Sequence, residues 1–486
     1  MPSHQLYIDR RPLWIVLLAR SSRLIFLILL AFAFFWFVNQ PPWEGLNPQA
    51  YKAIGAFFLC TILWLSQLIP LAITGLLAIV VIPLLGILPA KEVFSYFGNE
   101  AVFFILGAFI LSAAIMKTGL STRLAVLFLK KTKLTPRGLV YRIFFSTAVL
   151  SCLMSEHAVA AFFFPIILEI ARSLDFEPFG GEYGKKLFLA MAWGCIIGGI
   201  VTYLGGARAP LAVGMLREIS GQQIGFFQWM KTTVMVALPL FLFGYLILTY
   251  YFKTDVDSVE KAKEALEAKA KKIGSISFTE FMTAIILAGS IFCWVALGED
   301  FGLAPISIIA VVLLFVFKLV EWRDIEEYVN WGIILMYGGA IALGRAVDSS
   351  GALEWVSVKI IIIPQYFAAH VGLTTIFWLV AILSFASIFL TELFSNAAVV
   401  ALLLPVSIKM ALSSHVDPSV MTYAVAIPAG LGFIMPMGTP AVAIAYSSGY
   451  LRVRDIALPG LCLNLAGWFF FMLVVYFIWP LIGVNI

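Results

Sequence analysis

Long apolar runs, almost free of charged residues, recur along the whole chain and constrain its fold more than any other feature. One such run, residues 62–88, reads ILWLSQLIPLAITGLLAIVVIPLLGIL. A membrane-crossing helix needs about 20 mostly apolar residues. Of the 486 residues, 62% are hydrophobic and only 12% are charged, whereas a soluble domain carries about 25% charged residues. We therefore predict an all-α polytopic membrane protein whose main surroundings are the lipid bilayer.

The apolar runs occur in two series with the same order. Window reading places the first series at 24–38, 52–69, 71–88, 100–116, a split run 139–172, 187–216 and 230–252. The second series lies at 278–297, 303–320, 332–347, a split run 372–412, 420–450 and 461–482. If each split run is a re-entrant hairpin, the total is about 11 transmembrane helices plus two hairpins. Treating both split runs as full crossings is an alternative that the sequence leaves open.

Basic residues predict the orientation of the chain. They concentrate before the first span, in the loop 117–137 and in the charged segment 253–273. Cytoplasmic loops are enriched in lysine and arginine, so we predict a cytoplasmic N-terminus in a multi-pass plasma (inner) membrane protein. The net charge of +5 is explained by these loops and does not indicate a nucleic-acid partner.

Two pairs of segments resemble each other and indicate an internal repeat. SEHAVAAFFFPI (155–166) aligns with SNAAVVALLLPV (395–406), and GAFILSAAIMKTGL (107–120) aligns with GAIALGRAVDSSGA (339–352). An odd number of crossings in each half makes the second copy inverted, as in many secondary transporters. The predicted organisation is a cytoplasmic segment with the first span (1–45), repeat 1 (46–252), a charged cytoplasmic connector (253–275) and repeat 2 (276–486), each repeat with its hairpin.

Each half has two predicted interruptions of helix inside the membrane. The first is the serine-led tip of the split run, where a helix begins and its free N–H groups suit an anion. The second is rich in glycine and proline, reading GCIIGGIVTYLGGARAP (194–210) and PAGLGFIMPMGTPAVA (428–443). Such breaks expose carbonyl oxygens that can coordinate a cation. A kink in a packed helix explains one break, but not four breaks at matched positions.

Three ionisable residues fall within these interruptions: Glu156, His157 and Arg208. Ionisable groups at membrane depth are costly and often functional. Glu156 and Arg208 could form a buried pair that holds the broken helices together. Alternatively, Arg208 is a fixed cation that attracts an anionic substrate, or Glu156 and His157 exchange a proton, since histidine titrates near neutral pH.

Several blocks make the chain resemble the divalent anion/sodium symporter family. They are 62–88, FLTELFSNAAVVALLLPV (389–406) and MPMGTPAVAIAYSSGYLRVRDIALPG (435–460). The resemblance implies an elevator-type transporter, a homodimer, and hairpin tips that bind substrate carboxylates and sodium. Carried over by position, substrate would contact residues of both tips and of the two breaks: Ser155, Glu156, His157, Arg208, Ser395, Asn396, Ala397 and Thr439. Sodium would bind at Ser395, Asn396 and Gly438 in the second half, and at Ser155 and Gly205 in the first.

This chain departs from the family pattern in the first half. Its motifs read Ser-Glu-His and Ser-Asn-Ala where the family has Ser-Asn-Thr. On the resemblance, Arg208 lies near the first sodium position and would place a permanent positive charge there. We therefore expect either coupling to sodium, or coupling in which protons or counter-anion exchange replace part of the sodium.

The sequence thus predicts a secondary active transporter of small anions, either di- and tricarboxylates or sulfate-like ions. The alternative is a cation/proton antiporter that uses Glu156 and His157 without an organic anion. We expect no enzyme activity, because neither an HExxH nor a GxSxG motif occurs, and we expect no organic cofactor.

Overall fold

A computed structural model describes residues 13–129, 134–176 and 181–482. In these ranges the chain is helical, with 24 α-helices and no strand. Nine described helices are long and apolar enough to cross a membrane, which confirms the all-α polytopic prediction; the number of crossings and the re-entrance of the hairpins stay predictions. The basic residues before residue 13 and those at 130–133, used to predict orientation, lie outside the described residues.

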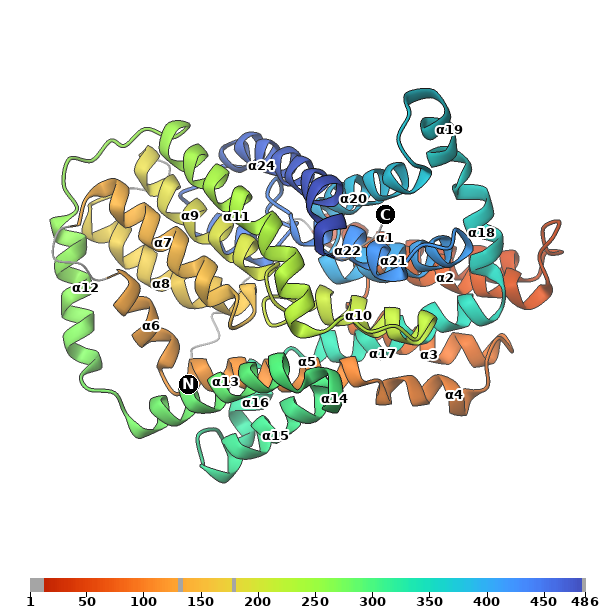
Figure 1. The fold of residues 1–486 in the computed structure, drawn as a ribbon, viewed down its shortest axis with the longest axis horizontal. Coiled ribbons are helices and arrows are strands. Elements are labelled where there is room, and N and C mark those ends of the chain that lie inside the picture. Colours follow the sequence, from red (N-terminus) through yellow and green to blue (C-terminus); the bar gives the residue numbers. More distant parts are fainter. Residues whose placement is uncertain (1–12, 130–133, 177–180, 483–486) are drawn as a thin grey trace.

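The helices before the connector follow the predicted spans closely (Figure 1). They are α1 (Leu13–Val38), α2 (Pro48–Ser66), α3 (Leu71–Leu84), α4 (Ala90–Ser95), α5 (Glu100–Lys117), α6 (Leu120–Leu129), α7 (Pro136–Ser151), α8 (Glu156–Ser173), α9 (Glu182–Gly199), α10 (Arg208–Ser220) and α11 (Phe226–Tyr250). The run 139–172 is split as predicted, because α7 ends at Ser151 and α8 begins at Glu156.

The connector contains α12 (Glu260–Ile273), and the helices after it repeat the earlier order. They are α13 (Phe278–Ala296), α14 (Gly298–Phe301), α15 (Leu303–Val316), α16 (Trp322–Tyr328), α17 (Trp331–Ser349), α18 (Ala352–Ile360), α19 (Ile362–Val371), α20 (Thr375–Leu393), α21 (Asn396–Ser413), α22 (Pro418–Ala426), α23 (Pro440–Ser447) and α24 (Val453–Leu473). The α18–α19 pair was not predicted. It occupies the place in the second series that α6 occupies in the first.

Two close helix contacts join the halves in one layer, which lies along the lower part of Figure 1. Helix α3 packs on α17, and α5 packs on α15. A Cβ on Gly339 would lie 2.2 Å from the carbonyl oxygen of Gly75, and a Cβ on Gly107 would lie 2.6 Å from Cβ of Ser307. The shift that aligns Gly107 with Gly339 also aligns Gly75 with Ser307, so the two contacts are equivalent. Small residues allow this close approach of membrane helices.

The helices of the split runs and of the breaks form a second layer. Helix α7 packs on α9 at very short range, because a Cβ on Gly198 would lie 1.9 Å from the carbonyl oxygen of Ala148. Helix α8 packs on α9 and α23, and α21 packs on α22 and α10. Each tip helix therefore lies against the helix that follows the break of the other half. Helix α10 also contacts α5 and α17, which links the two layers.

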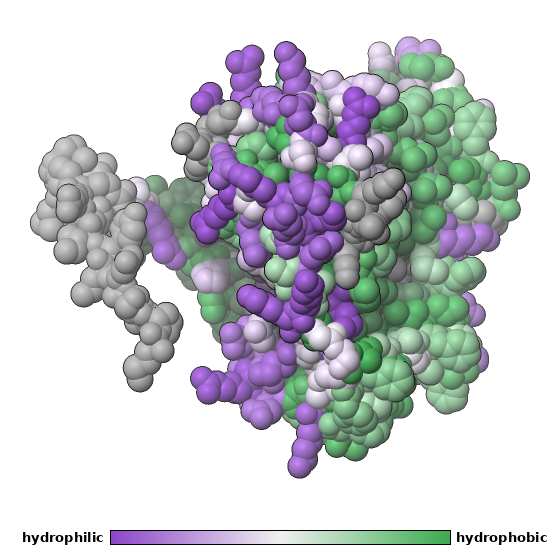
Figure 2. All heavy atoms as spheres, turned by 90° about the vertical axis from the view of Figure 1, so that its left-hand side faces the viewer, coloured by the Kyte–Doolittle hydropathy of each residue, from purple (hydrophilic) through white to green (hydrophobic). Residues whose placement is uncertain are grey.

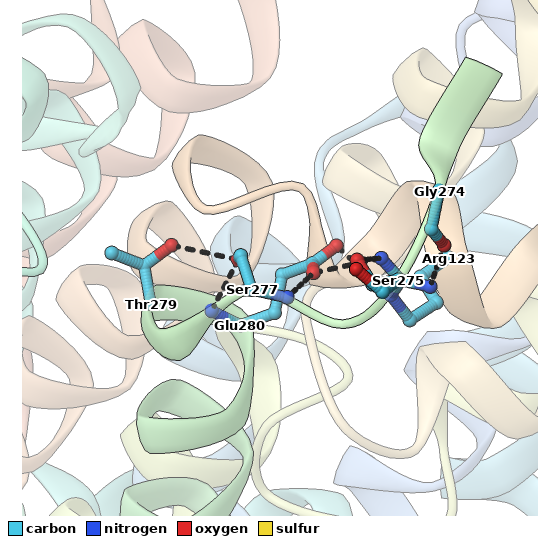
Figure 3. A network of polar contacts seen from close by, with 6 residues as sticks. All are labelled: Arg123, Gly274, Ser275, Ser277, Thr279 and Glu280. Atoms are coloured by element: carbon cyan, nitrogen blue, oxygen red, sulfur yellow. Dashed lines mark hydrogen bonds and ion pairs between the residues drawn. The ribbon is translucent and has the colours of Figure 1, made fainter.

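The connector is held on one side of the molecule by specific polar contacts. Arg123 on α6 donates to both carboxylate oxygens of Glu280, at 3.0 and 2.9 Å, and to the carbonyl oxygens of Gly274 and Ser275 (Figure 3). Asp255 accepts hydrogen bonds from the N–H groups that begin α9. Seen from the α12 side, hydrophilic side chains gather over this face while hydrophobic ones cover the flank at the right (Figure 2).

Candidate functional site

The first tip begins α8 with a capped helix N-terminus. The side chain of Ser155 accepts a hydrogen bond from the N–H of Ala158 at 3.3 Å, as an N-cap serine does. The N–H of Glu156 donates to the carbonyl oxygen of Gly205 at 2.9 Å. The tip is therefore joined directly to the first break, where residues 200–207 leave helical structure between α9 and α10.

Glu156 and Arg208, separated by 52 positions in the chain, meet at this break. Arg208 Nη1 donates to Glu156 Oε2 at 3.5 Å, and the two side chains are 2% and 7% exposed. Both residues are the first of their helices, α10 and α8. The structure thus brings together the two residues that the sequence suggested as a pair, in surroundings almost without water.

The guanidinium of Arg208 lies between the breaks of the two halves. A Cβ on Gly206 would lie 2.4 Å from Arg208 Nη1, and a Cβ on Gly430 would lie 2.3 Å from Arg208 Nε. Arg208 Nη2 is buried and has no hydrogen-bond partner among the described residues. Because a guanidinium keeps its charge, a fixed positive charge with one unused donor lies at the interface between the breaks.

His157 does not join this pair. Its side chain is exposed, and no hydrogen bond or ion pair links it to Glu156 within the described ranges. It lies beside Glu156 at the start of α8 but on a different face of the helix. The structure therefore provides no direct path for proton exchange between the two residues.

The second tip has the same cap with neutral neighbours. Ser395 accepts from the N–H of Ala398 at 3.2 Å, and Ala397 is buried in the first turn of α21. Oγ1 of Thr391 lies 2.7 Å from Asn396 Oδ1 and 2.9 Å from the carbonyl oxygen of Ala429, and its single proton is shared between these two acceptors. Thr391 thereby connects the second tip to the short turn of helix Pro428–Gly430, which leads into the second break, residues 431–439.

Glu392 is a buried ionisable residue that the sequence analysis did not single out. Its carboxylate accepts hydrogen bonds from the N–H groups of Phe433 at 2.7 Å, Ile434 at 3.0 Å and Met435 at 2.8 Å, and from Asn464 Nδ2 at 2.7 Å. Its position one residue after Thr391 in an apolar run was the signal that could have revealed it, since acidic residues within spans are rare.

Gly438 and Thr439 end the second break. A Cβ on Gly438 would lie 2.7 Å from Glu392 Oε2, so a larger residue there would displace the Glu392 carboxylate. Thr439 is 1% exposed, and its hydroxyl donates to the carbonyl oxygen of Gly432 at 3.3 Å. Of the predicted second-half residues, Gly438 thus lies directly against Glu392, and Asn396 is joined to the neighbouring Thr391. In the first half, Gly205 contacts the tip through the backbone of Glu156.

The two tips are brought into the same layer, but within the described ranges no hydrogen bond joins Ser155 to Ser395 or Asn396. The same ranges contain no group of three or more histidine, cysteine, aspartate or glutamate residues that could hold a metal ion. A cation at either break would therefore depend largely on carbonyl, hydroxyl and amide oxygens, the hard ligands that suit weakly bound cations.

Solved structures with a similar fold are membrane transporters. The YdaH transporter of Alcanivorax borkumensis superposes with a TM-score of 0.54 at 16% identity, covering 80% of this chain and 88% of that one. The antimetabolite efflux pump MtrF of Neisseria gonorrhoeae gives 0.53 at 13% identity, covering 92% and 97%. Serine-capped tips beside broken helices, in an all-helical membrane fold, are an arrangement that secondary transporters use.

The sequence pattern described as "Sodium:sulfate symporter transmembrane region" matches residues 20–484, and the chain belongs to this family. Sodium-dependent dicarboxylate transporters named SdcS are similar to it. The one from Staphylococcus saprophyticus is 24% identical over 472 residues, covering 90% of this chain and 89% of the relative. One from Staphylococcus aureus is 26% identical over 490 residues, covering 95% and 91%. The family predicted from the motifs is thereby confirmed.

Proposed function

We propose that this protein is a sodium-coupled secondary transporter of small anions, with di- or tricarboxylates as the first candidates and sulfate-like ions as the second. The observation that carries the proposal is the pairing of each serine-capped tip with a broken helix, with Arg208 between the two breaks. Dicarboxylate transport by the relatives supports this substrate class. The proposal places the protein in the plasma membrane, with a cytoplasmic N-terminus.

The substrate would bind where the two tips approach the breaks. The N-termini of α8 and α21 supply N–H groups and partial positive charge, which stabilise carboxylate or sulfate oxygens. Ser155, Ser395 and Asn396 add side-chain hydrogen-bonding groups. Thr439 and Ala397 would line the second-half side of the substrate site. Arg208 adds a permanent charge and the unused donor Nη2, while Glu156 balances that charge when no substrate is bound. His157, on the exposed face of the first turn, would contribute at the entrance.

Sodium would bind in the second half, at Ser395, Asn396 and Gly438. The 431–439 break provides backbone carbonyls beside a neutral tip, and the nearby Glu392 is negative. In the first half, sodium at Ser155 and Gly205 is disfavoured because the Arg208 guanidinium packs on Gly206 and would repel it. We therefore infer fewer sodium ions per cycle than two symmetric sites would give.

The transport cycle that we propose is elevator-type alternating access in a homodimer. The matched helix orders of residues 46–252 and 276–486 support two inverted repeats, joined by the connector. The layer that contains α8, α21 and the breaks would move relative to the layer of α3, α5, α15 and α17. The cation/proton antiporter alternative is less well supported, because Glu156 is paired with Arg208 and, within the described ranges, no hydrogen bond or ion pair joins His157 to either side chain.

Purified protein in liposomes tests the function directly. We expect uptake of labelled succinate, citrate or sulfate under an inward sodium gradient, and little uptake when sodium is replaced by choline. Proton gradients and internal counter-anions are tested in parallel. Failure to move any of these anions under any gradient would refute the proposal. Cation flux that ignores anions and is abolished by Glu156→Gln would instead support the antiporter.

A binding measurement locates the site. Substrate should raise the unfolding temperature of the wild-type protein in the presence of sodium, because a ligand that binds the folded state stabilises it. We expect Asn396→Ala to lose most of this shift. Asn39→Ala is the matched control, since Asn39 is exposed and its side chain donates to the carbonyl oxygen of Phe35 in the preceding helix. Equal shifts in both variants would place the substrate elsewhere.

A further inference from the structure

We propose that Glu392 is a positioning residue for the second-half site, and that its charge and its hold on the 431–439 break together set the affinity for the coupling cation. This inference rests on the proposed sodium-coupled function and deepens it. Glu392 does not itself contact the substrate. It acts through the segment that carries Gly438 and through the electrostatic potential of the site.

The contacts of Glu392 favour its carboxylate form. All its hydrogen-bond partners among the described residues are donors: three consecutive backbone N–H groups, from Phe433 to Met435, and the amide of Asn464. The residue is 4% exposed. No lysine, arginine or histidine in the described ranges lies within ion-pair distance of it, so peptide and amide dipoles alone offset its charge.

These contacts fix the shape of the break. In a planar trans peptide the N–H group points opposite to the preceding carbonyl, and the described residues contain no cis peptide bond. The three N–H groups that face Glu392 therefore turn the carbonyls of Gly432, Phe433 and Ile434 away from it. The Gly432 carbonyl accepts from Thr439, which carries the constraint to the end of the break.

The neighbouring residue, Thr391, holds the tip of the same site. Its hydroxyl bonds to Asn396 Oδ1 and to the carbonyl oxygen of Ala429. Two consecutive residues at the end of α20 thus position the tip side chain and the break together. A change at Glu392 would alter the relative placement of Asn396 and Gly438.

The two halves differ in buried charge at this position. The position three residues before the tip serine is Glu392 in the second half and the neutral Cys152 in the first. The first half has Glu156, but Arg208 lies beside it and balances its charge. The unbalanced negative charge therefore belongs to the second half. In surroundings of low dielectric constant such a charge attracts a cation over several ångströms.

The sodium dependence of Glu392→Gln tests the proposal. Initial rates of succinate uptake are measured in proteoliposomes, first against sodium at saturating succinate and then against succinate at saturating sodium. We expect the KM for sodium to rise about tenfold or more, while the KM for succinate at saturating sodium changes little. A general loss of folding would lower the maximal rate without raising the KM for sodium selectively.

Two further variants distinguish an effect of the Glu392 charge on sodium affinity from a structural effect of the substitution. Glu280→Gln is the matched control, because Glu280 also accepts backbone and side-chain donors but lies at the connector, joined to Arg123. It should leave the KM for sodium unchanged. The double variant Glu392→Gln/Asn464→Asp returns a carboxylate to the same cluster, and we expect it to recover most of the sodium affinity.

The results that would overturn the inference are distinct from those that would overturn the function. Wild-type protein without sodium-dependent uptake refutes the proposed coupling and this inference with it. A sodium-dependent wild type with an unchanged KM for sodium in Glu392→Gln refutes the inference alone, as does an equal rise in Glu280→Gln. If Glu392→Gln does not fold, Glu392→Asp replaces it. The shorter carboxylate cannot reach all three N–H groups, so an unchanged KM for sodium there also refutes the inference.

Discussion

Arg208 in the first half of the chain packs directly on Gly430 in the second half. A Cβ on Gly430 would lie 2.3 Å from Arg208 Nε and 2.6 Å from Nη2. The charged side chain that pairs with Glu156 is therefore located by a glycine more than two hundred residues away. The contact makes the first-half ion pair dependent on the backbone of the second-half break.

Gly430→Ala should impair transport in the same way as a change at Arg208. The added methyl would force the guanidinium to shift, and overpacking of this kind typically costs about 1–3 kcal/mol. We expect a lower unfolding temperature and an uptake rate reduced well below wild type. Gly98→Ala is the control, because no atom lies within 4 Å of a Cβ built there. Wild-type uptake by Gly430→Ala would show that the position of Arg208 is not critical.

The Glu156–Arg208 pair should show strong coupling in a double-mutant cycle. Removing one partner of a buried pair leaves an unpaired charge and costs about 3–5 kcal/mol. We expect Glu156→Gln and Arg208→Met to lower the unfolding temperature individually, and the double variant to be more stable than either. Thermal unfolding in detergent measures this. Additive effects would mean that the pair contributes no interaction energy.

Gly339→Ala should destabilise the contact between α3 and α17. The new Cβ would lie 2.2 Å from the backbone oxygen of Gly75, and backbone cannot move aside as a flexible side chain can. We expect a loss of about 1–3 kcal/mol, seen as a lower unfolding temperature. Gly289→Ala on α13 has open space at its Cβ and should be neutral. Equal behaviour of the two variants would contradict the close packing.

The ion pair between Lys117 and Asp324 should give a stability term that depends on pH. Lys117 Nζ lies 2.6 Å from Asp324 Oδ1, and the hydrogen bond from Lys117 lowers the pKa of Asp324. Because the pKa is lower in the folded state, this stabilisation is present above the unfolded pKa of about 3.9 and is lost as pH falls through the folded value.

We therefore expect Asp324→Asn to unfold at a lower temperature than wild type at pH 7, with the difference narrowing as the pH is lowered toward 3. Thermal unfolding across this range measures it. Asp300→Asn is the control, because Asp300 is exposed and has no described ion-pair partner. A difference that stays constant with pH would exclude this carboxylate as its source.

Local features of the site were predictable from the sequence because they depend on neighbouring residues. The caps at Ser155 and Ser395 follow from a polar residue directly before an apolar helix. The α18–α19 pair was missed, because each of its helices is only about half the length of a crossing. An acidic residue within an apolar run is unusual, but the role of Glu392 was missed because its partners, residues 433–435 and Asn464, lie 41 or more positions further along the chain.

The sequence by itself determined the membrane class, the paired serine tips, the glycine-rich breaks and the family, since hydropathy and helix-breaking residues act over short stretches of chain. Only the tertiary structure decided which charges meet. Glu156 pairs with Arg208, His157 stays apart, Arg208 reaches Gly430, and Glu392 accepts the N–H groups of the second break. These relationships join residues far apart in the chain. They depend on how helices pack, and no local pattern encodes that packing.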